Sequence, residues 1–232
     1  MDSKTVSASI RKVVHPCLRD NGFQRFSDRH AWRLHDDRID VVNFQSFNSY
    51  TAASIGCTTY SFSVNLGTYF RFVPDHIVIA RNPWTNKRKL PKEYECLFRG
   101  SLLRSFPQKE LDRRDVWYID PRGRYLDGAM ENARLLLNGE GMLWFERFDH
   151  ESEILGLLLD GDQKMPYLWG FGNRPSPVRS LLTGYLALKL GQNQLAVTEL
   201  ENAAAHTGFD GIRAAIAEDI KKAKASFSSR GS

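Results

Sequence analysis

The segment Thr59–Phe70 constrains the fold more than any other part of the chain, because its side chains alternate in character. One set is apolar: Tyr60, Phe62, Val64 and Leu66. The set between them is small or polar: Ser61, Ser63, Asn65 and Gly67. A period of two places the sets on opposite faces of a β-strand. We expect the apolar set to face the core and the polar set to meet solvent or bond a covering loop.

Shorter strands are expected on both sides of this one. They are Phe23–Phe26, His30–His35 and Ile39–Phe47 before it, and Cys96–Arg104 and Val116–Ile119 after it. Short turns such as 36–38 favour antiparallel pairing. The polar stretch 48–58 is expected to be a loop.

Helical patterns occupy both ends of the chain. A helix is expected over Ser3–Arg19, where Pro16 is a position for a kink or an end. From Leu126 onward the apolar spacing is helical, and Pro177–Leu190, Leu195–His206 and Gly211–Ala225 are the last three expected helices. The predicted fold class is α+β: an N-terminal helix on a mainly antiparallel sheet of about five or six strands, with an α-helical C-terminal region.

The predicted organisation has four parts. Residues 1–160 form an α+β domain, 161–177 a Gly/Pro-rich connection, 178–225 a helical region and 226–232 a frayed tail. Residues 180–206 resemble one tetratricopeptide-type hairpin, through small residues such as Gly184 and Ala203. A single copy is equally typical of a plain helical hairpin.

Composition limits the classes of function. The 232 residues are 42% hydrophobic and 25% charged, typical of a globular protein rather than a collagen, a coiled coil or a disulfide scaffold. Net charge is +5, divided as +8 over residues 1–125 and −3 over the remainder. A basic half can attract nucleic acid, a membrane surface or an acidic protein, or it can simply be a solvated surface.

Cysteine and histidine spacing indicates no cofactor and no metal site. Cys17, Cys57 and Cys96 are far apart, no C-x-x-C occurs, and the histidines are scattered. Asp36, Asp37 and Asp40 lack the spacing of a calcium loop, and the pair Asp36-Asp37 is typical of a turn. Unpaired thiols and the lack of a signal peptide or a long apolar run predict a cytoplasmic protein with no membrane association. No catalytic motif is recognisable, so an enzyme is not favoured.

Two sets of residues are candidates for binding. Amide and hydroxyl groups on one face of the predicted sheet form a candidate ligand site: Asn43, Gln45, Ser63 and Asn65. The alternative is an ordinary solvent-facing polar face. The second set is a basic loop around a tryptophan, a candidate partner site for an acidic protein or a nucleic acid: Arg81, Trp84, Lys87, Arg88, Lys89 and Lys92. A solvated loop is the alternative there.

Four phrases in order resemble an uncharacterised bacterial family, the domain of unknown function 4304 family. They are NGFQRFSDRHAW, IDVVNFQSFN, SFSVNLGTYF, and CLFRGSLLR followed by DVWYI. The resemblance covers about residues 3–148. It implies a compact α+β domain and no catalytic residues, and some relatives look like members of toxin-immunity neighbourhoods.

These observations favour a cytoplasmic, non-catalytic protein-interaction module, with immunity as one form. A nucleic-acid-associated protein that uses the loop 81–92 is the first alternative. An enzyme or small-ligand binder with a polar pocket on the sheet is the second. The partner and the oligomeric state are not predicted.

The predicted connection at 161–177 can be tested by limited proteolysis. Gly- and Pro-rich segments between folded parts are preferred sites of cleavage. We expect the first cut within 161–177 and a folded N-terminal fragment, identified by mass spectrometry. First cleavage inside 1–160, with 161–177 intact, would contradict the predicted boundary.

Overall fold

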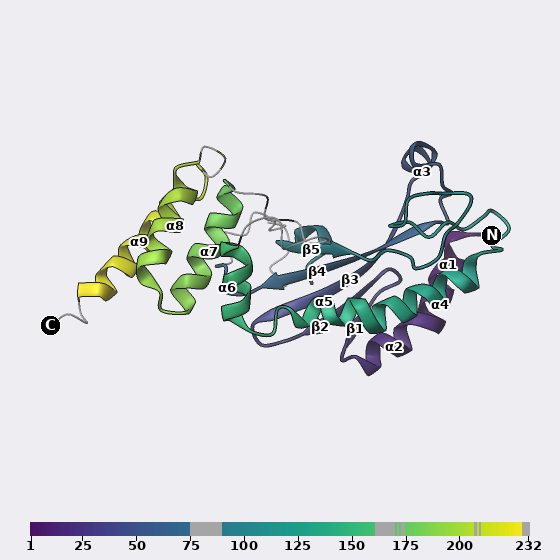
Figure 1. Cartoon of the computed structure of the whole chain (residues 1–232), viewed down its shortest axis with the longest axis horizontal. Helices are drawn as coiled ribbons and strands as arrows, with labels where there is room; N and C mark the ends of the chain where they lie inside the picture. The colour runs from purple at the N-terminus through teal and green to yellow at the C-terminus, as the bar shows by residue number, and fades with distance from the viewer. Residues whose placement is uncertain are drawn as a thin grey trace. The chain divides into compact units, whose positions relative to one another are not determined.

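The structure is a computed structural model, and it describes residues 1–74, 90–160, 170, 172, 175–206, 208 and 210–228. Two compact units are present among these residues. The first comprises residues 1–69 and 90–146, and the second comprises 70–74 and the described residues from 147 onward. Helices and an antiparallel sheet are both present, so the predicted α+β class is confirmed (Figure 1).

A five-stranded sheet forms the centre of the first unit, with its strands in sequence order. They are β1 (Arg25–Phe26), β2 (His30–Leu34), β3 (Arg38–Ser46), β4 (Phe62–Phe70) and β5 (Phe98–Ser101). Trp32 lies opposite Val41, and Asn65 opposite Ser101, in antiparallel registers. The prediction of a strand over Val116–Ile119 is wrong. This segment contacts the sheet through an isolated β-bridge between Trp117 and Phe62.

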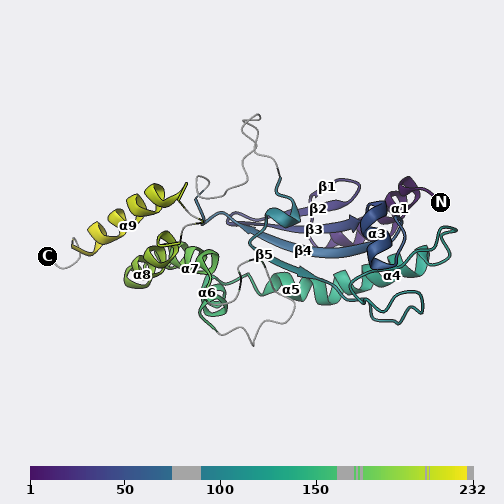
Figure 2. The ribbon, with the colours of Figure 1, turned by 90° about the horizontal axis from the view of Figure 1, so that it is seen from above.

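Two long helical segments cover one face of this sheet (Figures 1 and 2). The first runs through α1 (Ser3–Ser9), the π-helical η1 (Ile10–Val14) and α2 (His15–Asp20). The second runs through α4 (Leu126–Leu136), the π-helical η3 (Leu137–Gly141) and α5 (Met142–Glu146). Pro16 does not end the first segment, because it lies in the first turn of α2, where its missing N–H is not needed.

The alternation in β4 gives the predicted apolar face. Phe62, Val64 and Leu66 are fully buried, whereas Tyr60 precedes the strand and is half-buried. The polar face is also largely buried: Ser61 is fully buried, and Ser63 and Asn65 are 7% and 8% exposed. The Ser61 side chain bonds to the backbone of a neighbouring segment, which was the alternative expectation. Its Oγ accepts a hydrogen bond from the Ile119 N–H at 3.1 Å. The expectation of a solvent-facing side is therefore wrong for this strand.

The predicted loop 48–58 contains a short helix, α3 (Ser49–Ile55). The Asn48 side chain accepts a hydrogen bond from the Thr51 N–H at 2.8 Å and caps its first turn. Gly56 ends the helix at a φ of 82°, in the left-handed region. The helix was not predicted because it has no apolar stripe: its residues are mostly small or polar, and Ala52 is its one buried residue.

Helices form the second unit. They are α6 (Glu151–Leu159), α7 (Pro177–Lys189), α8 (Asn193–Ala204) and α9 (Arg213–Ser228). The buried Arg179 guanidinium donates to the carbonyl oxygens of Leu158 at 2.9 Å and Asp160 at 2.8 Å, and so caps the end of α6. A Cβ at Gly184 would lie 2.6 Å from Leu200 Cγ, so α7 and α8 approach too closely there for any side chain.

We expect Phe62→Ala to destabilise the protein strongly. The Phe62 ring is fully buried and lies 5.6 Å from the Trp117 ring and 5.5 Å from the Phe44 ring. Its removal leaves a cavity, which costs about 3–5 kcal/mol of unfolding free energy. Urea denaturation measures the change, with Tyr60→Ala as a half-buried control on the same face. A loss below 1 kcal/mol for Phe62→Ala would show that this face is not the core.

Candidate functional site

A chain of side-chain hydrogen bonds crosses three strands on the sheet face opposite the long helical segments. The Ser101 hydroxyl donates to Asn65 Oδ1 at 2.6 Å, and Asn65 Nδ2 donates to Gln45 Oε1 at 2.7 Å. The structure thus brings together two of the predicted ligand residues, Gln45 and Asn65. Ser101 completes the chain and was not predicted.

The other two predicted residues lie on the same face. Asn43 and Gln45 alternate on β3, and Ser63 and Asn65 alternate on β4. Asn43 and Ser63 are buried, and neither side chain has a hydrogen-bond partner within the described part of the chain. Their polar atoms are not among the fully buried atoms that lack a partner, so these atoms keep contact with solvent. We call these five residues, Asn43, Gln45, Ser63, Asn65 and Ser101, the polar patch.

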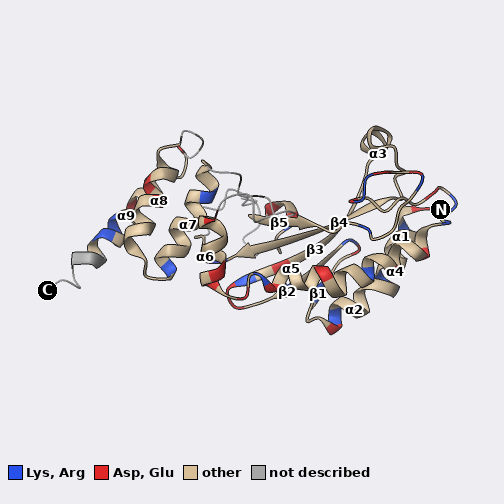
Figure 3. Cartoon of the chain, in the orientation of Figure 1, with Lys and Arg blue, Asp and Glu red and all other residues tan. Residues whose placement is uncertain are grey.

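Uncharged groups dominate this surface. Figure 3 shows β4 without a charged residue, as its sequence FSVNLGTYF requires. His30 lies opposite Asn43 and stacks on Trp32, with ring centroids 5.4 Å apart. Burial, with a smaller contribution from the Lys92 charge, lowers the pKa of His30 to about 4. His30 is therefore neutral at physiological pH.

Residues 90–96 cover part of the same face beside the polar patch. Trp32 Nε1 donates to the Pro91 carbonyl at 2.7 Å, which fixes this segment over β2. The segment contains a single 3₁₀ turn, η2 (Glu93–Glu95), in which Glu95 Oε2 accepts from the Lys92 N–H at 2.6 Å. Cys96 Sγ lies 2.9 Å from the position of a Cβ on Gly67, so only glycine admits this cover.

Two tyrosines on elements next to the sheet are highly exposed. Tyr94 of η2 is 67% exposed, and Tyr50 of α3 is 85% exposed. Figures 1 and 2 place α3 on the side of the sheet away from α4. Exposed aromatic side chains are therefore carried by α3, which follows β3 closely in the sequence, and by η2, which belongs to the segment that covers part of this face.

A buried carboxyl on η2, that of Glu93, interacts electrostatically with the half-buried Arg99 of β5. Glu93 is 5% exposed, and its carboxyl has no hydrogen-bond partner among the described residues. Burial raises the pKa of Glu93, and the positive charge of Arg99 only partly offsets this. Arg99 Nε is buried and also lacks a hydrogen-bond partner in that part of the chain. Neither group is satisfied by the fold.

A comparison with known protein families identifies the family of the segment that contains the sheet and the polar patch. Residues 14–147 match the model of the family described as Domain of unknown function (DUF4304). The chain belongs to this family. The matched DUF4304 segment contains every strand of the sheet and the whole polar patch. No curated protein and no solved structure matches the chain.

The predicted basic-loop residues can be placed only in part. Arg81, Trp84, Lys87, Arg88 and Lys89 lie outside the described residues. Lys92 is half-buried at the start of η2, on the DUF4304 sheet face that carries His30. The partner site at this loop stays a prediction.

Asp40 is a buried ionic centre of the DUF4304 sheet, on the face covered by the helices. Its carboxylate accepts from Arg33 Nε at 2.9 Å, His35 Nε2 at 2.9 Å and Thr68 Oγ1 at 3.2 Å, and it pairs with Arg38 at 3.2 Å. Burial alone would raise its pKa, but the His35 hydrogen bond and the two arginine charges outweigh burial and lower it. Asp40 thus lies in a strand, as the predicted strand Ile39–Phe47 required, and has a structural role.

Features of a metal site or a membrane span do not appear in the described ranges. No group of three His, Cys, Asp or Glu side chains among those residues could hold a metal ion. No helix described by the structure has the length and hydropathy needed to cross a bilayer. Cys17, Cys57 and Cys96 are free thiols, and burial raises the pKa of Cys96 well above its usual value.

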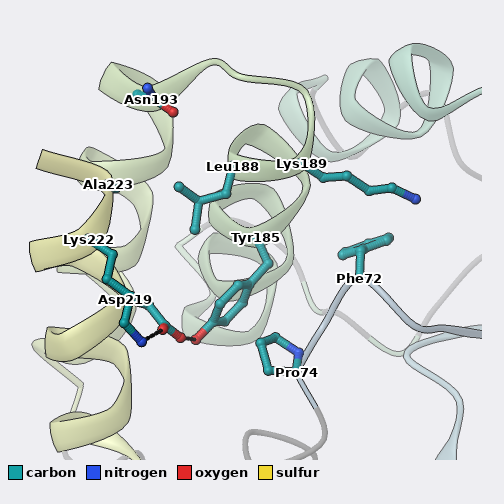
Figure 4. Close-up of a pocket in the computed structure, with 9 residues that line it drawn as sticks. All are labelled: Phe72, Pro74, Tyr185, Leu188, Lys189, Asn193, Asp219, Lys222 and Ala223. Carbon is teal, nitrogen blue, oxygen red and sulfur yellow. Dashed lines mark hydrogen bonds and ion pairs between the residues drawn. The ribbon is translucent and has the colours of Figure 1, made fainter. Parts of the chain in front are cut away.

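The second unit has a pocket of about 500 Å³, distinct from the polar patch (Figure 4). Phe72, Pro74 and Leu188 line its apolar side. On its polar side, Tyr185 Oη donates to Asp219 Oδ2 at 2.9 Å, and Lys222 Nζ lies 3.4 Å from Asp219 Oδ1. These polar groups bond one another, so the pocket indicates no particular ligand.

We expect Glu93→Gln to stabilise the protein at pH 7. The raised pKa means that the folded state holds the Glu93 proton more tightly than the unfolded state, so stability falls as pH rises above the ordinary value of 4.5. Removing the buried charge should increase the free energy of unfolding by about 1 kcal/mol at neutral pH. The gain should vanish below about pH 4, where Glu93 is protonated.

Glu95→Gln is the matched control for this experiment, because Glu95 lies on the same turn but caps the Lys92 N–H. It should not stabilise. Thermal unfolding at several pH values compares the two variants. A loss of stability in Glu93→Gln at pH 7 would show that the charged carboxylate is favourable in the folded state.

Proposed function

We propose that this protein is a non-catalytic protein-interaction module whose partner docks on the polar patch and on Tyr50 and Tyr94. The observation that carries the proposal is the composition of that surface. It combines unpartnered amide and hydroxyl groups at Asn43 and Ser63 with two highly exposed aromatic rings.

This composition suits protein recognition. Tyrosine contributes a large contact area at low cost in conformational entropy, and asparagine and serine adapt their hydrogen bonds to the partner. Exposed rings at 85% and 67% can bury much area on binding, as interface anchors do. Because the side chains of the polar patch are uncharged, binding there avoids the desolvation penalty that buried charges impose on an interface.

Three titratable groups of the first unit support binding rather than catalysis. A general base works best with a pKa near the working pH. His30 lies well below that range, and the Cys96 thiol lies well above it. The Asp40 carboxylate is held by its ion pairs. None of these three groups is suited to proton transfer at neutral pH.

Immunity against a toxin is one form of the proposed function, with the toxin as the partner. Free thiols at Cys17, Cys57 and Cys96 support a reducing cytoplasmic location. Nucleic-acid binding through the loop 81–92 is the competing proposal, and the same experiment separates the two.

The test compares Tyr50→Ala/Tyr94→Ala with Leu135→Ala/Leu143→Ala. The two leucines are also exposed, at 54% and 62%, but lie on the second long helical segment. A partner is first identified by affinity purification and then purified and titrated calorimetrically. We expect the tyrosine variant to lose at least about tenfold in affinity, or 1.4 kcal/mol, and the leucine variant to match wild type.

Equal affinity of the tyrosine variant and wild type would overturn the proposed surface. Binding to RNA or single-stranded DNA that falls steeply with salt, and that is lost in Lys87→Gln/Arg88→Gln/Lys89→Gln, would favour the competing proposal. Circular dichroism of each variant checks that it is folded.

A further inference from the structure

The outer edge of β5 carries backbone groups that pair with no other strand among the described residues. The Leu102 N–H donates to the Val64 carbonyl at 3.0 Å, and Gly100 lies opposite Leu66. In an antiparallel pair, residues alternate between bonded and non-bonded positions. The N–H and C=O of Leu102 and Gly100 therefore face β4. Those of Arg99 and Ser101 point away from the sheet.

Side chains at this edge are also incompletely bonded. The Arg99 guanidinium makes no hydrogen bond or ion pair within the described residues, and its Nε is buried. Ser101 uses its single hydroxyl proton on Asn65, so the lone pairs of its Oγ remain as acceptors. Because Arg99 is half-buried and only its Nε is fully enclosed, its terminal N–H groups are the donors at this edge, with the Ser101 acceptor two residues later.

We propose that a second copy of this chain pairs its β5 antiparallel to β5, with the two-fold axis at Gly100. In this register Arg99 of each copy lies opposite Ser101 of the other. Both residues have outward backbone groups, so they exchange N–H···O=C hydrogen bonds. Arg99 and Ser101 side chains lie on one face of the strand, which brings the free donor of each copy to the free acceptor of the other.

The sequence Arg99-Gly100-Ser101 is complementary to itself in this register, which favours a second copy over an unrelated strand. An isologous two-fold contact needs one surface that matches itself, and it closes without further growth. Gly100 lies opposite Gly100 of the second copy at a non-hydrogen-bonded position. The two Cα atoms are closest at such a position, so the absence of a side chain favours the approach. Pairing also covers an edge that would otherwise be open to unspecific association.

The inference goes beyond the proposed function. Because the two-fold axis is perpendicular to the sheet, both polar patches lie on the same face of one shared sheet. Four residues per strand make a small contact, so the dimer is expected to be weak and concentration-dependent.

Ser101→Pro and Ser101→Ala form a matched pair for the test. Both remove the hydroxyl bond to Asn65, but only proline removes the outward N–H. Sedimentation velocity over a wide concentration range should show a monomer–dimer equilibrium for wild type. Ser101→Ala should dimerise within a few-fold of wild type, and Ser101→Pro should stay monomeric. A monomeric wild type at every concentration, or dimerisation of Ser101→Pro equal to that of wild type, would overturn the inference.

Amide hydrogen exchange of wild type gives a readout that does not depend on a variant's folding. The Arg99 and Ser101 N–H groups should become at least tenfold more protected as the concentration rises, while the exposed Glu140 should not change. Protection that appears only after a purified partner is added would overturn the second copy in favour of a partner strand. Dimerisation and loss of partner affinity in the tyrosine variant are measured separately, so either proposal can fail alone.

Discussion

The buried carboxylate of Asp40 is the interaction on which the sheet depends. A charge without solvent is tolerated in a protein only when it is paired and bonded, and Asp40 takes its partners from β2, β3 and β4. Arg33 lies directly opposite Asp40 in the β2–β3 register, and its guanidinium is 5.3 Å from the ring centroids of Phe23 and Phe145. A slip by one residue would turn Asp40 to the other face and leave the charge unpaired. The ion cluster therefore fixes the register of these strands, and the register determines which residues form the polar patch.

The sheet separates two kinds of polar group by face. Charged groups lie on the helix-covered side and are bonded to one another, as in the Asp40 cluster. Neutral groups lie on the opposite side and are bonded only in part, since Asn43 and Ser63 have no partner among the described residues. The fold thus uses its ions for its own stability and leaves neutral hydrogen-bonding capacity for recognition. Glu93 and Arg99 are exceptions on the recognition side, where the buried Glu93 carboxyl opposes stability and the Arg99 charge offsets this only in part.

Local sequence patterns predicted the helices and strands better than they predicted which segments pack against them. Alternation identified β4 and its apolar face, because side-chain direction in a strand follows from local geometry. It could not show that the polar face is covered as well, because the cover comes from residues 90–96, more than twenty positions along the chain. Ser101 was missed for the same reason: its role depends on the pairing of β5 with β4, which local sequence does not specify. The ionic role of Asp40 was not predicted, because its partners Arg33 and Thr68 become its neighbours only in the sheet.

The close approach of α7 and α8 at Gly184 has a consequence for the evolution of the second unit. Leu200 occupies the space that a side chain at position 184 would need. A larger residue at 184 is therefore acceptable only after Leu200 has become smaller, and a smaller residue at 200 by itself leaves a cavity. Each single change passes through a less stable protein, so the two positions should be inherited together. In an alignment of relatives that retain this hairpin, we expect the residues at 184 and 200 to vary as a pair, with their combined volume nearly constant.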